Sequence, residues 1–266
     1  MKKHLWITLV LAMIMVLTLA ACNRDSDDGD SQTTDTQQLG PLDWDHSGDN
    51  IILRVDERFN EGPPDQLANE IPPCTIRGDG HIIWVNELED GIQILESRLS
   101  DETIRNLIEL VIFSGFYDWE SNFAIPDLNN PQIRSITLNL FSEERTVSRY
   151  ADWPANGYQR ILDACRQASD TPVLFQPDGA WISAYEVPIE DGIGHWRWTP
   201  QAAGFALSDI AGDNPPRWIT GDLVKLIWEN TILPSTRSHV LDGNLAYTIA
   251  LQVPGIMRDA PPAPSE

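Results

Sequence analysis

The sequence predicts an α+β fold, with a mainly antiparallel sheet and helices packed on one of its faces. Runs rich in β-branched and aromatic residues flank Asp79-Gly80 and, later, Asp178-Gly179, a pattern typical of β-hairpins. Two other segments, near Ser100 and Tyr158, repeat apolar residues at the three-to-four-residue spacing of amphipathic helices. Strands in adjacent hairpins, with helices gathered separately, favour an α+β layer.

The chain begins with the pattern of an export signal. Lys2 and Lys3 precede a nearly continuous apolar run, which ends in Leu19-Ala20-Ala21-Cys22. This tetrapeptide resembles the lipobox of bacterial lipoproteins. The resemblance implies that residues 1–21 are a signal peptide and that Cys22 is acylated. One alternative is an uncleaved N-terminal anchor, which would have the same orientation because the two lysines stay inside. The other is a chance cysteine beside an ordinary cleavage site.

Residues 22–50 are expected to form an acidic, disordered tether. Up to Gln38 the segment is polar and charged, without aromatic residues, so little apolar burial can offset the entropy of ordering it. The whole chain has 18 Lys and Arg against 40 Asp and Glu, a net charge of −22. This balance argues against nucleic acid as a partner, because duplex binding needs cationic side chains to neutralise phosphates.

Two short motifs have both a functional and a structural interpretation. The segment from Asp43 to Asp49 matches the first positions of an EF-hand-type calcium loop, but Arg54 stands where the bidentate Glu is needed. The tripeptide Arg77-Gly78-Asp79 occurs in some adhesins that bind integrins, although it also suits a turn that needs glycine. We therefore expect turns at both places and no metal site.

Residues 51–168 form the first predicted α+β region. Its clearest helix begins at Ser100, whose hydroxyl can cap free backbone N–H groups, and ends at Gly115, which suits a left-handed conformation. A second amphipathic helix contains Tyr158 and Cys165. The predicted strands are residues 51–55, 74–77, 81–85, 92–99, 136–140 and 145–150.

Three parts of this region resemble a group of uncharacterised exported bacterial α+β domains. They are the hairpin at residues 75–84, the helix start Leu99-Ser100-Asp101-Glu102-Thr103-Ile104, and the pair Gly115-Phe116. The resemblance covers residues 51–167. It implies an exported setting and a fold, and it brings no activity.

Residues 172–257 form a second predicted region, followed by a loose Pro- and Ala-rich tail at 258–266. Strands at 173–175 and 180–187 are expected to form a hairpin around Pro177-Asp178-Gly179. A short helix follows Thr220, and a second hairpin joins strands at 237–241 and 244–253. The order of hairpin, helix and hairpin echoes the first region, so the chain could hold two similar subdomains or one continuous core.

Motifs for covalent chemistry are missing from the sequence. It has no Gly-x-Ser-x-Gly, no His-Glu-x-x-His, no glycine-rich phosphate loop and no Cys-x-x-Cys. The five histidines do not fall at metal-ligand spacing on one predicted face. We therefore name no catalytic residue, metal or cofactor.

Tryptophan is unusually frequent, and Trp196 and Trp198 occur in a long, poorly patterned segment. In a strand the two indoles would share one face. If exposed, they could form an apolar platform for a sugar ring or a partner's side chains. The alternative is that both rings fill core volume.

Cys74 and Cys165 are the cysteines that remain once Cys22 is acylated. Export would place them where disulfides persist, and an even pair without metal spacing favours a bridge. The alternative is two buried thiols that act as small apolar side chains.

Together these patterns predict a lipid-anchored extracytoplasmic protein. It would bind an unidentified protein or glycan, or have a structural place in the cell envelope, and its membrane contact would be the lipid on Cys22. The alternative function is a carbohydrate-active enzyme with a carboxylate pair near exposed tryptophans.

Overall fold

The computed structural model describes residues 40–127, 129–150, 152–190, 193–234 and 238–265. These residues belong to one compact unit. The predicted signal peptide, Cys22 and most of the predicted tether lie outside the described residues. Among the described helices, none has the length and apolar character needed to span a bilayer.

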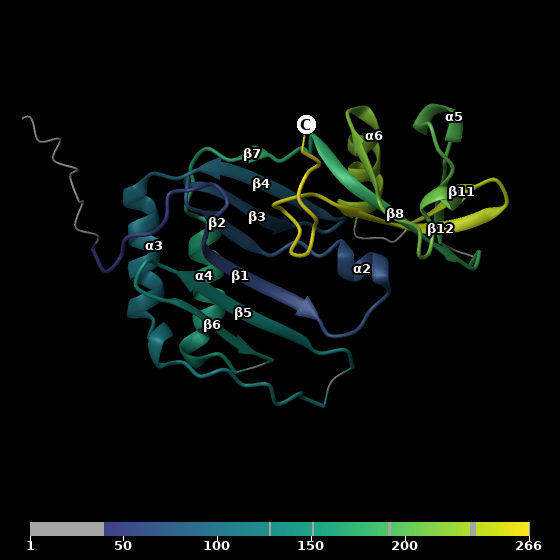
Figure 1. The fold of residues 1–266 in the computed structure, drawn as a ribbon. Helices are drawn as coiled ribbons and strands as arrows, with labels where there is room; N and C mark the ends of the chain where they lie inside the picture. The colour runs from purple at the N-terminus through teal and green to yellow at the C-terminus, as the bar shows by residue number, and fades with distance from the viewer. Residues whose placement is uncertain (1–39, 128, 151, 191–192, 235–237, 266) are drawn as a thin grey trace, which may run out of the picture. The chain divides into compact units, whose positions relative to one another are not determined.

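Seven strands of the described chain form the first sheet, in the order β6-β5-β1-β2-β3-β4-β7, with every neighbouring pair antiparallel (Figure 1). The predicted hairpin between β2 and β3 is confirmed. Gly80 has a φ of +84°, and its carbonyl accepts a hydrogen bond of 2.9 Å from Leu99 N. The strands are β1 (Ile51–Phe59), β2 (Cys74–Arg77), β3 (His81–Glu87), β4 (Ile92–Arg98), β5 (Gln132–Asn139), β6 (Glu144–Arg149) and β7 (Val173–Leu174).

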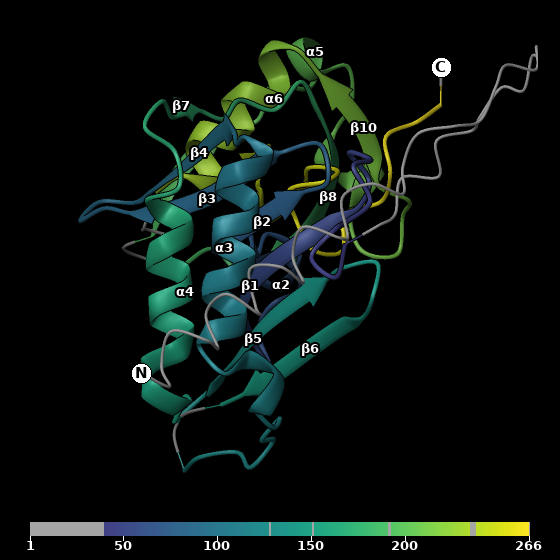
Figure 2. The same cartoon turned by 90° about the vertical axis from the view of Figure 1, so that its left-hand side faces the viewer.

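Helices α3 (Asp101–Phe113) and α4 (Gly157–Arg166) pack against one face of this sheet, side by side (Figure 2). The Ser100 hydroxyl caps α3 by accepting a hydrogen bond of 3.2 Å from Thr103 N. Gly115 follows α3 with a φ of +90°. The predicted α+β class, with a mainly antiparallel sheet and helices on one face, is therefore confirmed. The helix residues buried in this first core are Ile104, Leu107, Ile108, Val111, Tyr158, Ile161, Leu162 and Cys165.

The segment 40–50, which we predicted to be part of the disordered tether, is packed on the first sheet. Trp44 is only 1% exposed, and its indole N–H donates a hydrogen bond of 3.2 Å to the Gly78 carbonyl. Asp43 accepts at its backbone carbonyl from Phe141 N, at 3.0 Å. The ordered domain therefore begins before the predicted boundary, because one large aromatic side chain in a polar segment is enough to hold it.

The same segment contains the motif that partly matches a calcium loop. The Asp45 carboxylate accepts a hydrogen bond of 2.9 Å from Ser47 N, and Asn50 Nδ2 donates to the Asp45 carbonyl at 2.9 Å. These contacts hold a local polar turn, as predicted.

In the described part of the second region, five strands form another sheet, in the order β10-β8-β12-β11-β9. All its pairs are antiparallel except β9 with β11. Its strands are β8 (Gly179–Val187), β9 (Gly194–Arg197), β10 (Arg217–Thr220), β11 (Ser238–Asp242) and β12 (Leu245–Gln252). The short helices are α2 (Pro64–Ala68), before β2, and α5 (Pro200–Ala203) and α6 (Asp222–Ile227), which lie among these strands in sequence.

The predicted hairpin around Pro177-Asp178-Gly179 is wrong. β7 pairs with β4 at the edge of the first sheet, whereas β8 pairs with β10 and β12 in the second. This turn sequence therefore lies in a crossover between two sheets. The turn residues were identified correctly, but local sequence could not show that the two strands have different partners.

A second hydrophobic core joins the two predicted regions. Ile83, Val85 and Ile94, from β3 and β4, pack in one cluster with buried residues of the second sheet and α6. The side chain of Asn69 bonds to both Ile249 O and Leu251 N of β12, at 2.9 and 2.7 Å. The two regions are therefore parts of one continuous structure, although their sheets differ in strand order.

The C-terminal segment is held more firmly than the loose tail that we predicted from residue 258. The Arg258 side chain is 8% exposed and forms ion pairs with Asp56 and Glu70. Further on, Trp181 Nε1 donates a hydrogen bond of 3.0 Å to the Pro262 carbonyl. Composition indicated a tail, but it could not show partners about two hundred residues earlier in the chain.

Candidate binding pocket beside helix α6

The predicted tryptophan platform is not formed as an exposed pair. Trp198 is 6% exposed and donates its indole N–H to the Phe205 carbonyl at 2.9 Å, so its ring belongs to the second core. Trp196 is partly buried against the same core, and the two ring centroids are 6.1 Å apart. For Trp198, the alternative is therefore confirmed, because its ring fills core volume.

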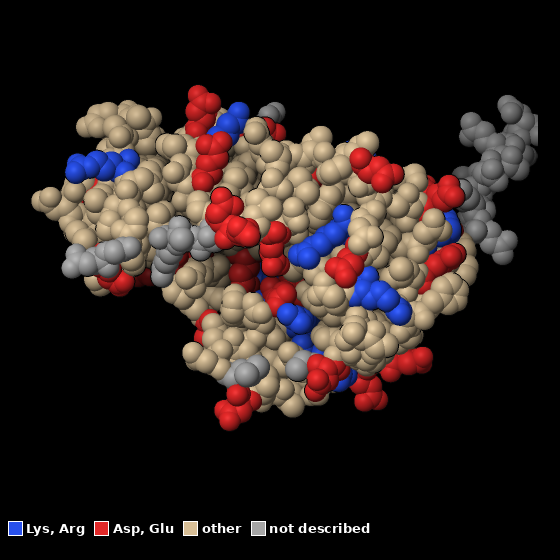
Figure 3. Space-filling model, turned by 180° about the vertical axis from the view of Figure 1, so that it is seen from behind, with Lys and Arg blue, Asp and Glu red and all other residues tan. Residues whose placement is uncertain are grey.

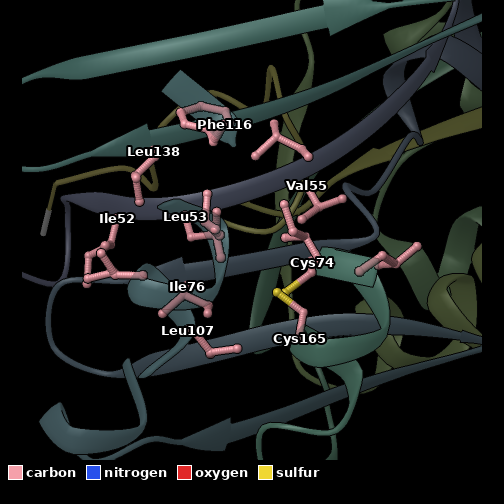
Figure 4. Close-up of a cluster of buried hydrophobic side chains, with 14 of the residues drawn as sticks. Ile52, Leu53, Val55, Cys74, Ile76, Leu107, Phe116, Leu138 and Cys165 are labelled. Atoms are coloured by element: carbon pink, nitrogen blue, oxygen red, sulfur yellow. The ribbon is translucent and has the colours of Figure 1, made fainter. Parts of the chain in front are cut away.

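The structure brings the two predicted disulfide cysteines together. Cys74 in β2 and Cys165 in α4 are both fully buried in the first core, and their side chains point toward one another (Figure 4). They are present as free thiols. Burial, together with a hydrogen bond and the charge interaction with Cys165, raises the pKa of the Cys74 thiol well above its usual value. A bridge between them remains a prediction.

Histidines form two close arrangements that the sequence pattern missed. His195 of β9 and His239 of β11 are paired across parallel strands, with ring centroids 5.7 Å apart. His81 Nε2 lies 2.8 Å from a Glu96 carboxylate oxygen. In the ranges that the structure describes, no group of three or more His, Cys, Asp and Glu side chains could hold a metal ion.

A mostly apolar pocket lies where the outer edge of β4 meets α6, and Figures 1 and 2 both place α6 beside the β4–β7 edge. The cavity has a volume of about 220 Å³. Its residues come from β4, from β7 and the chain that follows it, and from α6 and the turn after it. They are Ile92, Gln93, Ile94, Leu174, Phe175, Gln176, Pro177, Lys225, Trp228, Glu229 and Leu233.

The pocket exists because two different segments pair with the outer edge of β4. At one end Phe175 N donates to Ile94 O, at 2.9 Å, in continuation of β7. At the other end Ile92 N donates to Leu233 O, at 2.8 Å. Gln93 lies between these two hydrogen bonds, so the segments diverge there and leave the hollow.

Two aromatic side chains form a wall of the pocket. The rings of Phe175 and Trp228 meet edge to face, with centroids 5.6 Å apart. Trp228 is 3% exposed, so its ring is fixed by the second core. An edge-to-face pair of this kind holds ring positions more firmly than area burial alone. The wall is therefore a preformed apolar surface.

Helix α6 changes its winding where it borders the pocket. After Ile227 the chain continues as a π-helix from Trp228 to Ile232, and Leu233 N bonds back to Trp228 O at 3.2 Å. Wide turns of this type are rare in proteins, and those that occur are often found at functional sites. Here the turn begins at the aromatic wall.

Two exposed side chains of opposite charge complete the lining. Lys225 lies in α6, and Glu229 lies one turn further along. In the described part of the chain, neither of these two side chains forms a hydrogen bond or an ion pair. Lys225 is also the only lysine in the sequence after Lys3. This count was available from the sequence and could have drawn attention to the position.

One apolar side chain of the lining is also open to solvent. Leu174 of β7 is 60% exposed. An exposed apolar group at the rim of a pocket is accessible to a ligand.

Another hollow, of about 290 Å³, lies near the ends of β1 and β3 and includes Glu57, Glu70, Glu87 and Arg166 in its lining. Its carboxylates already form ion pairs, since Glu70 binds Arg258 and Glu87 lies 3.5 Å from Arg166.

The charged side chains of the surface are mixed. On the face seen in Figure 3, acidic side chains are spread between isolated basic ones. The pocket beside α6 is the better candidate for a ligand site because its lining is apolar and its charges have no partner among the described residues.

Comparison of the chain with protein-family models, with curated proteins and with solved structures gives no match. The resemblance to exported bacterial domains that the sequence motifs indicate stays a prediction.

Proposed function

We propose that the protein is a lipid-anchored extracytoplasmic binding protein, and that its ligand site is the pocket between β4, β7 and α6. The observation that carries this proposal is an open apolar pocket with a preformed aromatic wall. Apolar concave sites with a few polar groups are the usual form of small-ligand sites.

The size of the pocket limits what can enter it. A dry apolar cavity of about 150 Å³ is enough to bind benzene, and this pocket has about 220 Å³. Sites for drug-sized ligands begin at about 300 Å³. The pocket therefore suits one ring or one branched chain, either on a small molecule or on a partner's side chain.

The pocket lining favours binding over the alternative of a carbohydrate-active enzyme. Glycosidases of the usual type need two carboxyl groups across the scissile bond, about 5–10 Å apart. Glu229 supplies the one carboxylate of this lining. The tryptophan that borders the pocket is Trp228, and neither Trp196 nor Trp198 lines it.

Anchoring through Cys22 would keep this binding site at the outer surface of a membrane. Stable attachment needs more than one acyl chain, which a diacylglyceryl group on the cysteine supplies. Cys22→Ser should leave an unprocessed precursor. Normal processing and membrane retention of this variant without lipid would contradict the anchoring.

Toluene, a neutral probe with one ring, tests whether the pocket of the full mature protein binds an apolar group. Reductive ¹³C-methylation labels Lys225, so NMR reports on the pocket mouth. Toluene should shift this signal with saturation. Leu174→Trp, which fills the pocket from an exposed position, should abolish the shift.

Val173→Trp is the matched control, because Val173 is the next residue of the same strand and does not line the pocket. It should bind toluene as the wild type does. If toluene never saturates the signal, or if both variants bind equally well, the pocket is not the ligand site.

A further inference from the structure

The two charges at the pocket mouth carry information about the ligand. Lys225 and Glu229 are four positions apart, a spacing at which opposite charges on a helix commonly pair. Here Lys precedes Glu, which is the less favourable order for such a pair. Neither forms an ion pair with a described residue. As far as the described residues are concerned, both charges are therefore available to a bound molecule.

The pocket thus presents three features within one lining: an apolar hollow that holds one ring or branched chain, an ammonium group and a carboxylate. A ligand that satisfies all three has an apolar group and both an anionic and a cationic group beside it. An α-amino acid in its zwitterionic form has this arrangement.

We infer that the pocket binds an apolar α-amino acid of about the size of phenylalanine. Its side chain lies against Phe175 and Trp228, its carboxylate accepts a hydrogen bond from Lys225, and its ammonium donates one to Glu229. This inference rests on the proposed function, because it uses the same pocket.

The charge of the whole protein supports a zwitterion over an apolar acid. A net charge of −22 repels anions from solution, whereas a zwitterion has no net charge and approaches without this penalty. The ammonium of an apolar amine would pair with Glu229, but it would then face the like charge of the Lys225 ammonium. Only the ligand with both charges pairs both side chains.

Four probes that share one ring separate these contributions: L-phenylalanine, 3-phenylpropionate, 2-phenylethylammonium and toluene. Affinities are measured by isothermal titration calorimetry on the full mature protein at neutral pH and low salt. The variants are Lys225→Gln and Glu229→Gln. Asp222→Asn is the control, because Asp222 lies in the same helix but does not line the pocket.

Phenylalanine should bind at least tenfold more tightly than each singly charged probe. Lys225→Gln should weaken the binding of phenylalanine and phenylpropionate by about five- to tenfold, and it should leave the binding of phenylethylammonium unchanged or improved. Glu229→Gln should instead weaken the binding of phenylalanine and phenylethylammonium. These factors correspond to about 1–1.4 kcal/mol, just below the usual range for hydrogen bonds to charged groups, because both side chains are exposed.

Equal affinities for all four probes, unchanged in both variants, would overturn the amino-acid inference and leave the apolar pocket in place as a binding site. Failure of every probe to bind, toluene included, would overturn the proposed function as well. The two failures are therefore distinguishable.

Discussion

Arg258 and Asp56, which are 202 positions apart in the sequence, form a buried ion pair that fixes the C-terminal segment to the first sheet. Arg258 Nε donates to Asp56 at 2.7 Å, Nη1 donates to Glu70 at 2.6 Å, and Nη2 reaches the Glu57 carbonyl at 3.2 Å. Burial lowers the pKa of Arg258, but its hydrogen bonds to Asp56 and Glu70 raise it more, so the net shift is upward.

Arg258→Ala should destabilise the protein by about 3–5 kcal/mol, because it leaves two carboxylates buried without their cation. Urea unfolding at pH 7 measures this change. Arg58→Ala is the matched control, since the Arg58–Asp259 pair is long, at 4.0 Å, and exposed. It should cost about 0–1 kcal/mol. Equal effects of the two variants would show that the Arg258 contacts do not stabilise the fold.

Because segment 40–50 packs through Trp44, substitution of this residue should strongly lower the stability of the fold. Trp44→Ala should cost about 3–5 kcal/mol in unfolding free energy, the usual range for removing a buried aromatic side chain. Asp49→Ala, an exposed change in the same segment, should change stability by less than about 0.5 kcal/mol. A cost below about 1 kcal/mol for Trp44→Ala would mean that this segment is part of the tether after all.

The lowered pKa of Asp79, in the β2–β3 turn, predicts part of the loss of folding stability at low pH. Partial burial raises the pKa of its carboxyl, but the hydrogen bond from His81 N and the charges of Arg98 and His81 outweigh this, and the pKa is lowered. Its ionised form therefore stabilises the fold above the unfolded pKa of about 4, and this contribution is lost as pH falls through the folded value.

Asp79→Asn should accordingly lower stability at pH 7 and flatten the loss of stability as pH falls below about 4. Urea unfolding across this range measures both effects. Asp90→Asn, at an exposed position between β3 and β4, should follow the wild type. An Asp79→Asn curve parallel to that of the wild type would contradict the assignment.

We expect Cys74 and Cys165, whose side chains face one another in the first core, to form a disulfide if the protein is exported. Two thiols would each lose a proton and together transfer two electrons to the disulfide of an oxidising thiol exchange partner during folding, before the core closes. In the chain-entropy model, closing this long loop stabilises the fold by about 4–5 kcal/mol. A Cys74→Ala/Cys165→Ala double variant should show the corresponding loss of stability.

Non-reducing peptide mapping of envelope-purified protein reports the bridge directly. Full alkylation of both cysteines without reductant would show that the disulfide does not form and that the two thiols act as small core side chains.

Local signals in the sequence were sufficient for most elements of the first region. Ser100 and Gly115 marked the ends of α3, and the Gly78-Asp79-Gly80 segment marked a hairpin, because capping and turn geometry depend on a few adjacent residues. The partner of β7 could not be predicted, since its choice depends on the free edge of β4, which exists only in the assembled sheet.

The candidate site was missed for a similar reason. Phe175 and Trp228 are 53 positions apart, and each alone is consistent with ordinary core packing. The π-helix after α6 has no sequence pattern that separates it from the expected helix. Trp196 and Trp198 were predicted to form a platform because they lie in a long, poorly patterned segment and would share one face of a strand, but Trp198 is buried.

Crystals of the protein soaked with toluene would show whether the hollow between Phe175 and Trp228 holds an apolar group. We expect electron density for one ring against Phe175 and Trp228, and no such density in Leu174→Trp crystals. A hollow filled by hydrogen-bonded water in the soaked wild-type crystals, or closed by movement of α6, would contradict it.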